Sequence, residues 1–160
     1  MEKQLFLILH NIRSAYNVGA IFRSADGAGV TKIYLSGYTA MPCTADKIDK
    51  TSPEKMIEKT ALGAQHSVAW EKIENLDALL EKLKNENVRL VGLEKTDQAI
   101  EIKKYSPAFP MALILGHEVD GVTNDILEKC QDVIVIPMRG KKESLNVSVA
   151  AGIAMYDLLK

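Results

Sequence analysis

A polar segment near the C-terminus, Ser144-Leu145-Asn146, holds the side chains best placed for chemistry. The apolar, β-branched run Val133–Ile136 precedes it and predicts a buried strand, which Pro137 ends. Ser144 is placed to cap a helix that runs to about Leu159. Since ligands of α/β folds bind where strands lead into helices, this junction predicts a ligand site.

The basic residues are unevenly distributed along the chain. The formal net charge is −1 over 160 residues, which counts mildly against a nucleic-acid partner. However, three of the four arginines, Arg13, Arg23 and Arg139, lie in loop-like motifs, and Lys141 and Lys142 follow Arg139. Arginine suits bidentate contact with phosphate, so the distribution indicates a local basic patch on a nearly neutral protein.

A second polar motif, Asn11 to Ala25, follows the first apolar segment of the chain. Its spacing predicts a helix from about Val18 to Ala28, with Asn17 as the cap and Gly29 as the stop. Two interpretations of its polar residues are open. Either Asn17 and Arg23 line a pocket at the carboxyl ends of the strands, or they are a helix cap and a surface arginine. Spacing alone favours the second interpretation.

A third motif, Leu113–Gly121, contains a glycine directly after an apolar run. Gly116 permits the close approach of a ligand to the backbone. Glu118 either bonds polar substrate groups or caps the following helix. His117 has the chemistry of a general base, but no Ser or Cys partner lies at the spacing of a catalytic triad, so a hydrogen-bonding or surface role is favoured.

The elements that would position these motifs alternate between strand and helix along the chain. This alternation predicts a single α/β domain over residues 1–160, with a mostly parallel sheet and helices on both faces. Ala99–Tyr105 fits a turn or a short strand. The predicted strands are Leu5–His10, Lys32–Ser36, Ser67–Trp70, Arg89–Leu93, Met111–Leu115 and Val133–Ile136; the remaining predicted helices are Thr51 to Thr60, with a capping box, Asn75–Asn85, and Thr123 or Asn124 to Lys129.

The composition, and the motifs that the sequence lacks, narrow the range of possible functions. Apolar residues make up 47% and charged residues 26% of the chain, as in soluble globular proteins. Cys43 and Cys130 are too few for a disulfide framework or zinc site, so a reducing cytoplasm is expected. The apolar run Leu5 to Leu9 is too short for a membrane span or signal peptide. The sequence has no G-x-G-x-x-G after its first strand, no Walker loop and no metal-ligand spacing of Cys or His.

The three motifs, in this order, resemble the SpoU (TrmH-like) family of SPOUT RNA ribose 2′-O-methyltransferases. Asn11–Gly29, Leu113–Gly121 and Ile136–Ile153 match the three family motifs, and Lys59-Thr-Ala-Leu-Gly-Ala is similar to a short family signature. The match spans nearly the whole chain. The ordered set is far more specific than any single motif.

This resemblance implies an S-adenosylmethionine-dependent transfer of a methyl group to a ribose 2′-hydroxyl of tRNA or rRNA. It implies a C-terminal deep trefoil knot that holds the methyl donor, and a homodimer with the site near the subunit interface. It also implies roles for individual residues. The donor-binding set is Leu93, Gly116, Ile136, Met138 and Leu145, the catalytic set is Asn17, Arg23, Glu118, Ser144 and Asn146, and the RNA-binding set is Arg13, Arg139, Lys141 and Lys142.

Two other functions remain as alternatives. One is a non-catalytic RNA-binding or assembly module on the same fold, which need not keep the catalytic set. The other is a flavodoxin-like domain for a small ligand, which strand–helix alternation alone would suggest. The chain departs from many relatives at His117, where Asn or Gln is common, and in the expected lack of a separate RNA-binding domain. The RNA target and the modified nucleotide therefore stay open.

Overall fold

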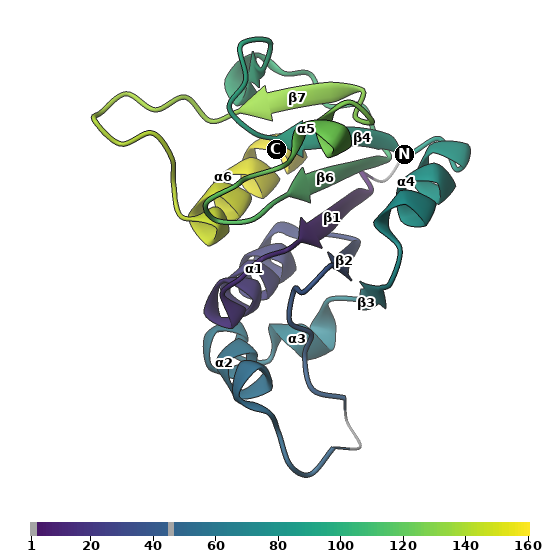
Figure 1. Cartoon of the computed structure of the whole chain (residues 1–160), viewed down its shortest axis with the longest axis vertical. Coiled ribbons are helices and arrows are strands. Elements are labelled where there is room, and N and C mark those ends of the chain that lie inside the picture. Colours follow the sequence, from purple (N-terminus) through teal and green to yellow (C-terminus); the bar gives the residue numbers. More distant parts are fainter. Residues whose placement is uncertain (1–2, 45–46) are drawn as a thin grey trace.

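The computed structural model describes residues 3–44 and 47–160 and has an α/β architecture (Figure 1). Within these ranges, seven strands form one sheet in the order β3-β2-β1-β6-β4-β7-β5, and every paired neighbour is parallel. The elements are β1 Leu5–His10, α1 Ala15–Ala28, β2 Lys32–Ser36, α2 Ser52–Ala61, α3 Ala64–Ser67, β3 Trp70–Ile73, α4 Leu76–Asn85, β4 Arg89–Leu93, β5 Ile100–Glu101, the 3₁₀ helix Ile102–Lys104, β6 Met111–Leu115, α5 Asn124–Leu127, β7 Asp132–Val135 and α6 Val147–Leu159.

Helices cover both faces of the sheet, as predicted. Successive side chains of a strand point to opposite faces, so β1 contributes to two separate cores. Leu7 and Leu9 pack in the core that contains residues of α1, α2 and α6. Ile8 packs in the core that contains residues of α4 and α5. Strand β6 is buried along its whole length, which explains its continuous apolar sequence.

Helix α1 begins earlier than its sequence indicated. The prediction of a start at Val18 with Asn17 as the cap was wrong, because Ser14 caps the helix and its side chain accepts a hydrogen bond from the Asn17 amide. Asn17 therefore lies in the first turn, where its side chain is free to bond elsewhere. The predicted stop is confirmed, since Gly29 has the left-handed conformation, with φ 80°.

Helix α6 begins later than predicted. Asn146, and not Ser144, is its cap, and the Asn146 side chain accepts a hydrogen bond from the Ser148 amide at 2.9 Å. The segment between β7 and α6 is therefore a longer loop than expected. In Figure 1 this loop extends away from the sheet before the chain returns into α6.

One further prediction, in the middle of the chain, was wrong. The strand predicted at Ser67–Trp70 starts only at Trp70, which pairs with Ile33 of β2. Residues Ala64–Ser67 form the short helix α3 instead, because left-handed residues at Leu62 and Gly63 end α2 and redirect the chain. The open segment Ala99–Tyr105 contains both β5 and the 3₁₀ helix. The capping box that starts α2 at Thr51 is confirmed.

Candidate ligand site at the carboxyl end of the sheet

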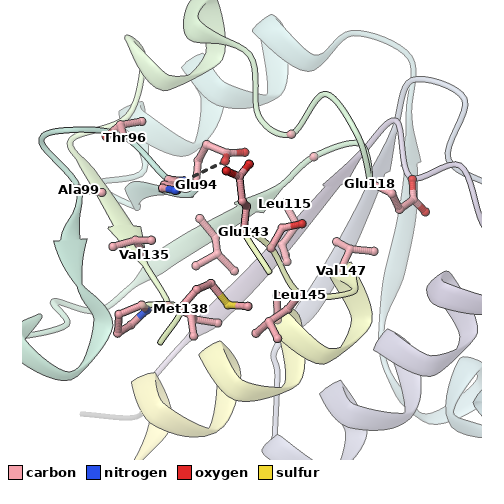
Figure 2. A pocket seen from close by; sticks show the side chains of 18 of the residues that line it. Glu94, Thr96, Ala99, Leu115, Glu118, Val135, Met138, Glu143, Leu145 and Val147 are labelled. Atoms are coloured by element: carbon pink, nitrogen blue, oxygen red, sulfur yellow. Dashed lines mark hydrogen bonds between the residues drawn. The ribbon is translucent and has the colours of Figure 1, made fainter. Parts of the chain in front are cut away.

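A cavity of about 450 Å³ lies beyond the carboxyl ends of β4, β6 and β7, next to the first turn of α6 (Figure 2). The strands that follow β1 directly in the sequence, β2 and β3, lie on one side of β1 in the sheet. Strands β6, β4, β7 and β5 lie on its other side. The strand order diverges again at β4, which has β6 on one side and β7 and β5 on the other, and the cavity lies at this second divergence. Crevices at such points are the usual ligand sites of open α/β sheets.

The predicted donor-binding residues all line this cavity. Leu93 ends β4, Gly116 follows β6, and Ile136, Met138 and Leu145 belong to the loop between β7 and α6. Three segments that are far apart in the sequence thus form one wall. Most of these side chains are apolar and half-buried, which suits a ligand with a flat apolar part.

Gly116 is required for a reason that the sequence did not reveal. A Cβ atom at this position would lie 2.2 Å from the carbonyl oxygen of Gly121. The Gly121 amide donates a hydrogen bond to the His117 carbonyl at 2.8 Å, so the turn folds back directly over Gly116. The glycine therefore permits the turn to close against itself at the edge of the cavity.

Glu94 is a cavity residue that sequence reasoning missed. Its carboxylate accepts hydrogen bonds from the Lys95 amide at 2.8 Å and the Val122 amide at 2.9 Å. This ties the end of β4 to the turn that follows β6. A carboxylate directly after a buried strand was the signal that could have identified it. Figure 2 shows Glu94 and Glu143 on the opposite side of the cavity from Leu145.

Glu118 connects the cavity to the loop after β1. Its carboxylate accepts hydrogen bonds from the Arg13 amide at 2.8 Å, the Ser14 amide at 2.9 Å and the Asn17 side-chain amide at 3.1 Å. Burial by itself would raise the pKa of Glu118, but these hydrogen bonds outweigh it and lower the pKa. Glu118 is therefore a charged anchor for the start of α1. It does not cap α5, which begins after Thr123.

Asn17 joins Glu118 to the C-terminal motif. The Asn146 side-chain amide donates to the Asn17 side-chain oxygen at 3.2 Å, while the Asn17 side-chain amide donates to Glu118. These contacts fix the orientation of both amides. The structure thus brings Asn17, Glu118 and Asn146 together in one hydrogen-bonded chain, with Ser144 exposed at the cavity nearby.

Comparison with known proteins identifies the family. The sequence profile of the SpoU rRNA Methylase family matches residues 4–156. This chain belongs to the SpoU family. It is 32% identical over 161 residues to the 23S rRNA (guanosine-2′-O-)-methyltransferase RlmB of Vibrio parahaemolyticus, covering 99% of this chain and 60% of that protein. It is 31% identical over 156 residues to the tRNA (guanosine(18)-2′-O)-methyltransferase of Aquifex aeolicus, covering 98% of this chain and 69% of that protein.

Solved structures have the same fold. The crystal structure of the A. aeolicus TrmH/SpoU tRNA modifying enzyme matches with a TM-score of 0.82 at 30% identity, covering 99% of this chain and 75% of that one. The AviRb methyltransferase of Streptomyces viridochromogenes, solved with AdoMet, matches with a TM-score of 0.84 at 21% identity, covering 99% and 60%. This chain spans about 60% of the length of most of the curated SpoU relatives that it matches.

Arg23 lies apart from the other predicted catalytic residues of this SpoU chain. It is exposed and lines a separate surface hollow with Lys59, Thr60 and Tyr156. It follows Asn17 by six helical residues, which is a rise of about 9 Å along α1. Within one chain, Arg23 is therefore not a wall of the cavity.

The four predicted RNA-binding residues are all exposed. Arg13 is held through its amide by Glu118, next to the cavity. Arg139, Lys141 and Lys142 lie on the loop between β7 and α6. The same loop carries Met138 and Ser144, which line the cavity. Three of the basic side chains therefore lie on a loop that lines the cavity, and Arg13 lies on a loop that is bonded to the cavity residue Glu118.

His117 is a hydrogen-bonding residue, as predicted. Its Nδ1 accepts hydrogen bonds from the Val119 amide at 3.1 Å and the Asp120 amide at 3.0 Å. Nδ1 therefore carries no proton, and the imidazole proton is on Nε2. The Asp120 carboxylate oxygen lies 3.3 Å from the same Nδ1. Because two amide donors already point at that nitrogen, this short distance does not represent an ion pair.

Neither a metal-binding cluster nor a membrane-spanning helix occurs among the described residues. Among residues 3–44 and 47–160, no group of three or more His, Cys, Asp or Glu side chains is arranged to hold a metal ion. In the same ranges, no helix has the length and apolar character needed to span a bilayer.

Proposed function

We propose that this chain is an S-adenosylmethionine-dependent methyltransferase that modifies a ribose 2′-hydroxyl of tRNA or rRNA. The convergence of the predicted donor-binding residues, from three separate segments, on one cavity carries this proposal. Membership of the SpoU family supports it, as do the names of the relatives, which are guanosine 2′-O-methyltransferases of rRNA and tRNA.

The cavity fits the methyl donor in size and chemistry. Its volume of about 450 Å³ lies within the usual range for sites that bind small molecules. Apolar side chains such as Leu93, Ile136 and Leu145 suit the flat adenine ring. The carboxylates of Glu94 and Glu143 suit the ribose hydroxyls and the positively charged amino group.

The transfer forms a bond between the ribose oxygen and the methyl carbon and breaks a carbon–sulfur bond, while the hydroxyl loses its proton. The donor supplies an activated methyl group on a sulfonium. In-line geometry is the main requirement, so positioning contributes most of the acceleration. Glu118 is a positioning residue in this scheme, because its hydrogen bonds hold the start of α1 and its lowered pKa makes it a weak base.

Arg23 has the charge to stabilise the developing alkoxide and the planar fork to bind an adjacent phosphate. We propose that it acts on the cavity of a second copy, and its separation from the cavity of its own chain supports this. A homodimer through α6 would allow this. Helix α6 is apolar on all sides and exposes Val149, Ile153 and Tyr156, as expected of a helix that another surface covers. Tyr156 also borders the Arg23 hollow.

The proposal includes three finer expectations. The first is a C-terminal trefoil knot, for which the support is that the loop before α6 lines one cavity with the segments after β4 and β6. The second is a single catalytic domain over residues 1–160. The third is action in the cytoplasm, with which the free thiols of Cys43 and Cys130 are consistent.

Methyl transfer to RNA tests the activity. The protein is incubated with labelled S-adenosylmethionine and unmodified total RNA, and the RNA is digested to nucleosides. We expect a labelled 2′-O-methylnucleoside with the wild type and none with Arg23→Ala. Arg23→Lys keeps the positive charge but loses the planar guanidinium group that binds phosphate through two hydrogen bonds. This variant should lower turnover by at least about tenfold. Donor binding without transfer would favour a non-catalytic RNA-binding module, and absence of donor binding would refute the proposal.

Mixed dimers test whether Arg23 acts across the interface. Arg23→Ala is mixed with Leu145→Arg, which blocks the donor cavity, under conditions that exchange subunits. Each variant alone should be inactive. If Arg23 serves the partner's cavity, half of the randomly paired dimers contain one intact site, and activity should recover to roughly a quarter of the wild type. No recovery despite measured subunit exchange would show that Arg23 serves its own chain.

A further inference from the structure

Tyr38 is an exposed aromatic residue at the edge of the cavity. Its side chain follows β2 and is 61% exposed, so at least one face of the ring is open to solvent. The Tyr38 ring packs edge to face with the imidazole ring of His117. The two ring centroids are 6.3 Å apart, and the angle between the ring planes is 81°. His117 lines the cavity, so Tyr38 stands one ring's width outside the cavity wall.

The turn that carries Tyr38 is held rigidly from two neighbouring strands. The Tyr38 amide donates to the Asn11 side-chain oxygen at 3.2 Å. The Lys72 ammonium of β3 donates to the carbonyls of Gly37 and Thr39 at 2.7 Å each, on both sides of Tyr38. Gly37 has φ 62° and packs against Asn11 so closely that a Cβ atom would lie 1.8 Å from the Asn11 side-chain oxygen. The turn therefore has little freedom to move.

Further polar contacts hold the same turn against the end of β1. Burial lowers the pKa of Lys72, so its charge is partly desolvated to hold the turn. Thr39 is buried, and its hydroxyl bonds the Leu9 carbonyl and the Ile12 amide. All of these polar contacts stabilise a turn whose largest side chain remains in water. A rigidly held, exposed aromatic ring is a binding feature, because little conformational entropy is lost when a flat ligand stacks on it.

We propose that Tyr38 is a stacking platform for an unpaired base of the RNA strand that presents its ribose at the mouth of the cavity. This inference rests on the proposed function. If the target ribose lies at the mouth of the cavity, the base bonded to it and the bases next to it lie close to that mouth, and Tyr38 lies there too, beside the cavity residue His117. The ring lies beside the polar side chain of His117, and the Tyr38 backbone amide bonds the polar side chain of Asn11, whereas the buried core of a protein–protein interface is enriched in apolar residues. Stacking also suits bases of any sequence.

RNA binding by three variants tests the platform. Tyr38→Ala removes the ring, Tyr38→Phe keeps it, and Ile48→Ala is a matched control, since Ile48 is an apolar side chain that is 95% exposed. Affinity is measured by fluorescence anisotropy with end-labelled, unmodified transfer RNA transcripts and single-stranded 23S rRNA fragments. We expect the Kd to rise about 5- to 100-fold for Tyr38→Ala, and to stay within about twofold of the wild type for the other two variants.

Two further readouts separate stacking from other causes. The slope of log Kd against log salt concentration should be the same for Tyr38→Ala and the wild type, because no phosphate contact is lost. The Kd for S-adenosylmethionine, measured by calorimetry, should not change. An unchanged RNA affinity in Tyr38→Ala, or equal losses in Tyr38→Ala and Tyr38→Phe, would overturn the platform, and the first of these would favour a protein partner. RNA binding without methyl transfer in the wild type would refute the proposed activity but leave this comparison valid.

Discussion

Replacing Glu118 with Gln should separate the anchoring of α1 from the chemistry of the site. The carboxylate accepts the Arg13 and Ser14 amides through different oxygens. Glutamine has one acceptor oxygen, and its NH₂ group would face the other amide, donor against donor. One backbone amide then loses its partner, and the remaining bonds lose their charge assistance. We expect the free energy of unfolding to fall by about 1–2 kcal/mol, at the lower end of the usual range because water reaches the exposed Arg13 amide.

Urea denaturation and calorimetry measure this loss. For a chain of 160 residues, it corresponds to a decrease in Tm of about 2–8 °C. A control, Glu128→Gln, removes an exposed carboxylate that accepts no hydrogen bond in the described part of the chain, and should change stability by less than about 0.5 kcal/mol. Equal stabilities of Glu118→Gln and the wild type at pH 7 would refute the anchoring role.

The pH dependence of the same comparison gives an independent check. The pKa of Glu118 is lowered in the folded state, so its contribution is complete above the ordinary glutamate pKa and is lost as the pH falls through the folded pKa. The stability difference between the wild type and Glu118→Gln should be constant from about pH 6 to 8 and should shrink below about pH 4.5. A difference that grows on acidification would contradict the reasoning.

Two other predictions concern packing and thiol chemistry. Gly19→Ala should lower the free energy of unfolding by about 1–3 kcal/mol in urea melts, because its Cβ would lie 2.1 Å from the Thr60 hydroxyl and 2.4 Å from the Ile57 carbonyl oxygen. Gly140→Ala, with nothing within 4 Å, is the control and should be neutral. Burial raises the pKa of Cys130 to about 11. Iodoacetamide at pH 8, followed by peptide mass spectrometry, should therefore alkylate Cys130 about 100-fold more slowly in the folded protein than in urea, and similar rates would contradict its burial.

The fold was predictable where one signal determined each element. Leu5–His10, Lys32–Ser36 and Met111–Leu115 are strands with the predicted bounds, because short apolar runs between turn residues leave little choice. Two of the errors occurred where two polar residues competed for one helix cap. Ser14 and Asn146 cap α1 and α6, although Asn17 and Ser144 are equally good capping types. Only the tertiary bonds of Asn17 to Glu118 and Asn146 distinguish these choices, and the local sequence does not contain them.

The cavity could be predicted from the sequence, whereas the position of Arg23 relative to it could not. Leu93, Gly116 and Ile136 each lie at or just after the end of a strand, and the ends of parallel strands meet at one edge of the sheet. Position in the sequence therefore determines position in space for these residues. Arg23 is on a helix, where the side of the sheet and the partner surface depend on packing. Its separation from the cavity could be found only in three dimensions.

The hydrogen-bonded chain of Asn146, Asn17 and Glu118 limits what these residues can do chemically. The two amides are oriented by their partners, and the carboxylate is a weak base because its pKa is lowered. None of the three is therefore suited to remove a proton from a ribose hydroxyl near neutral pH. An arginine stays protonated in proteins, so Arg23 could stabilise an alkoxide but not accept its proton. Under the proposed function, these residues therefore contribute geometry and charge, and water or another group takes the proton.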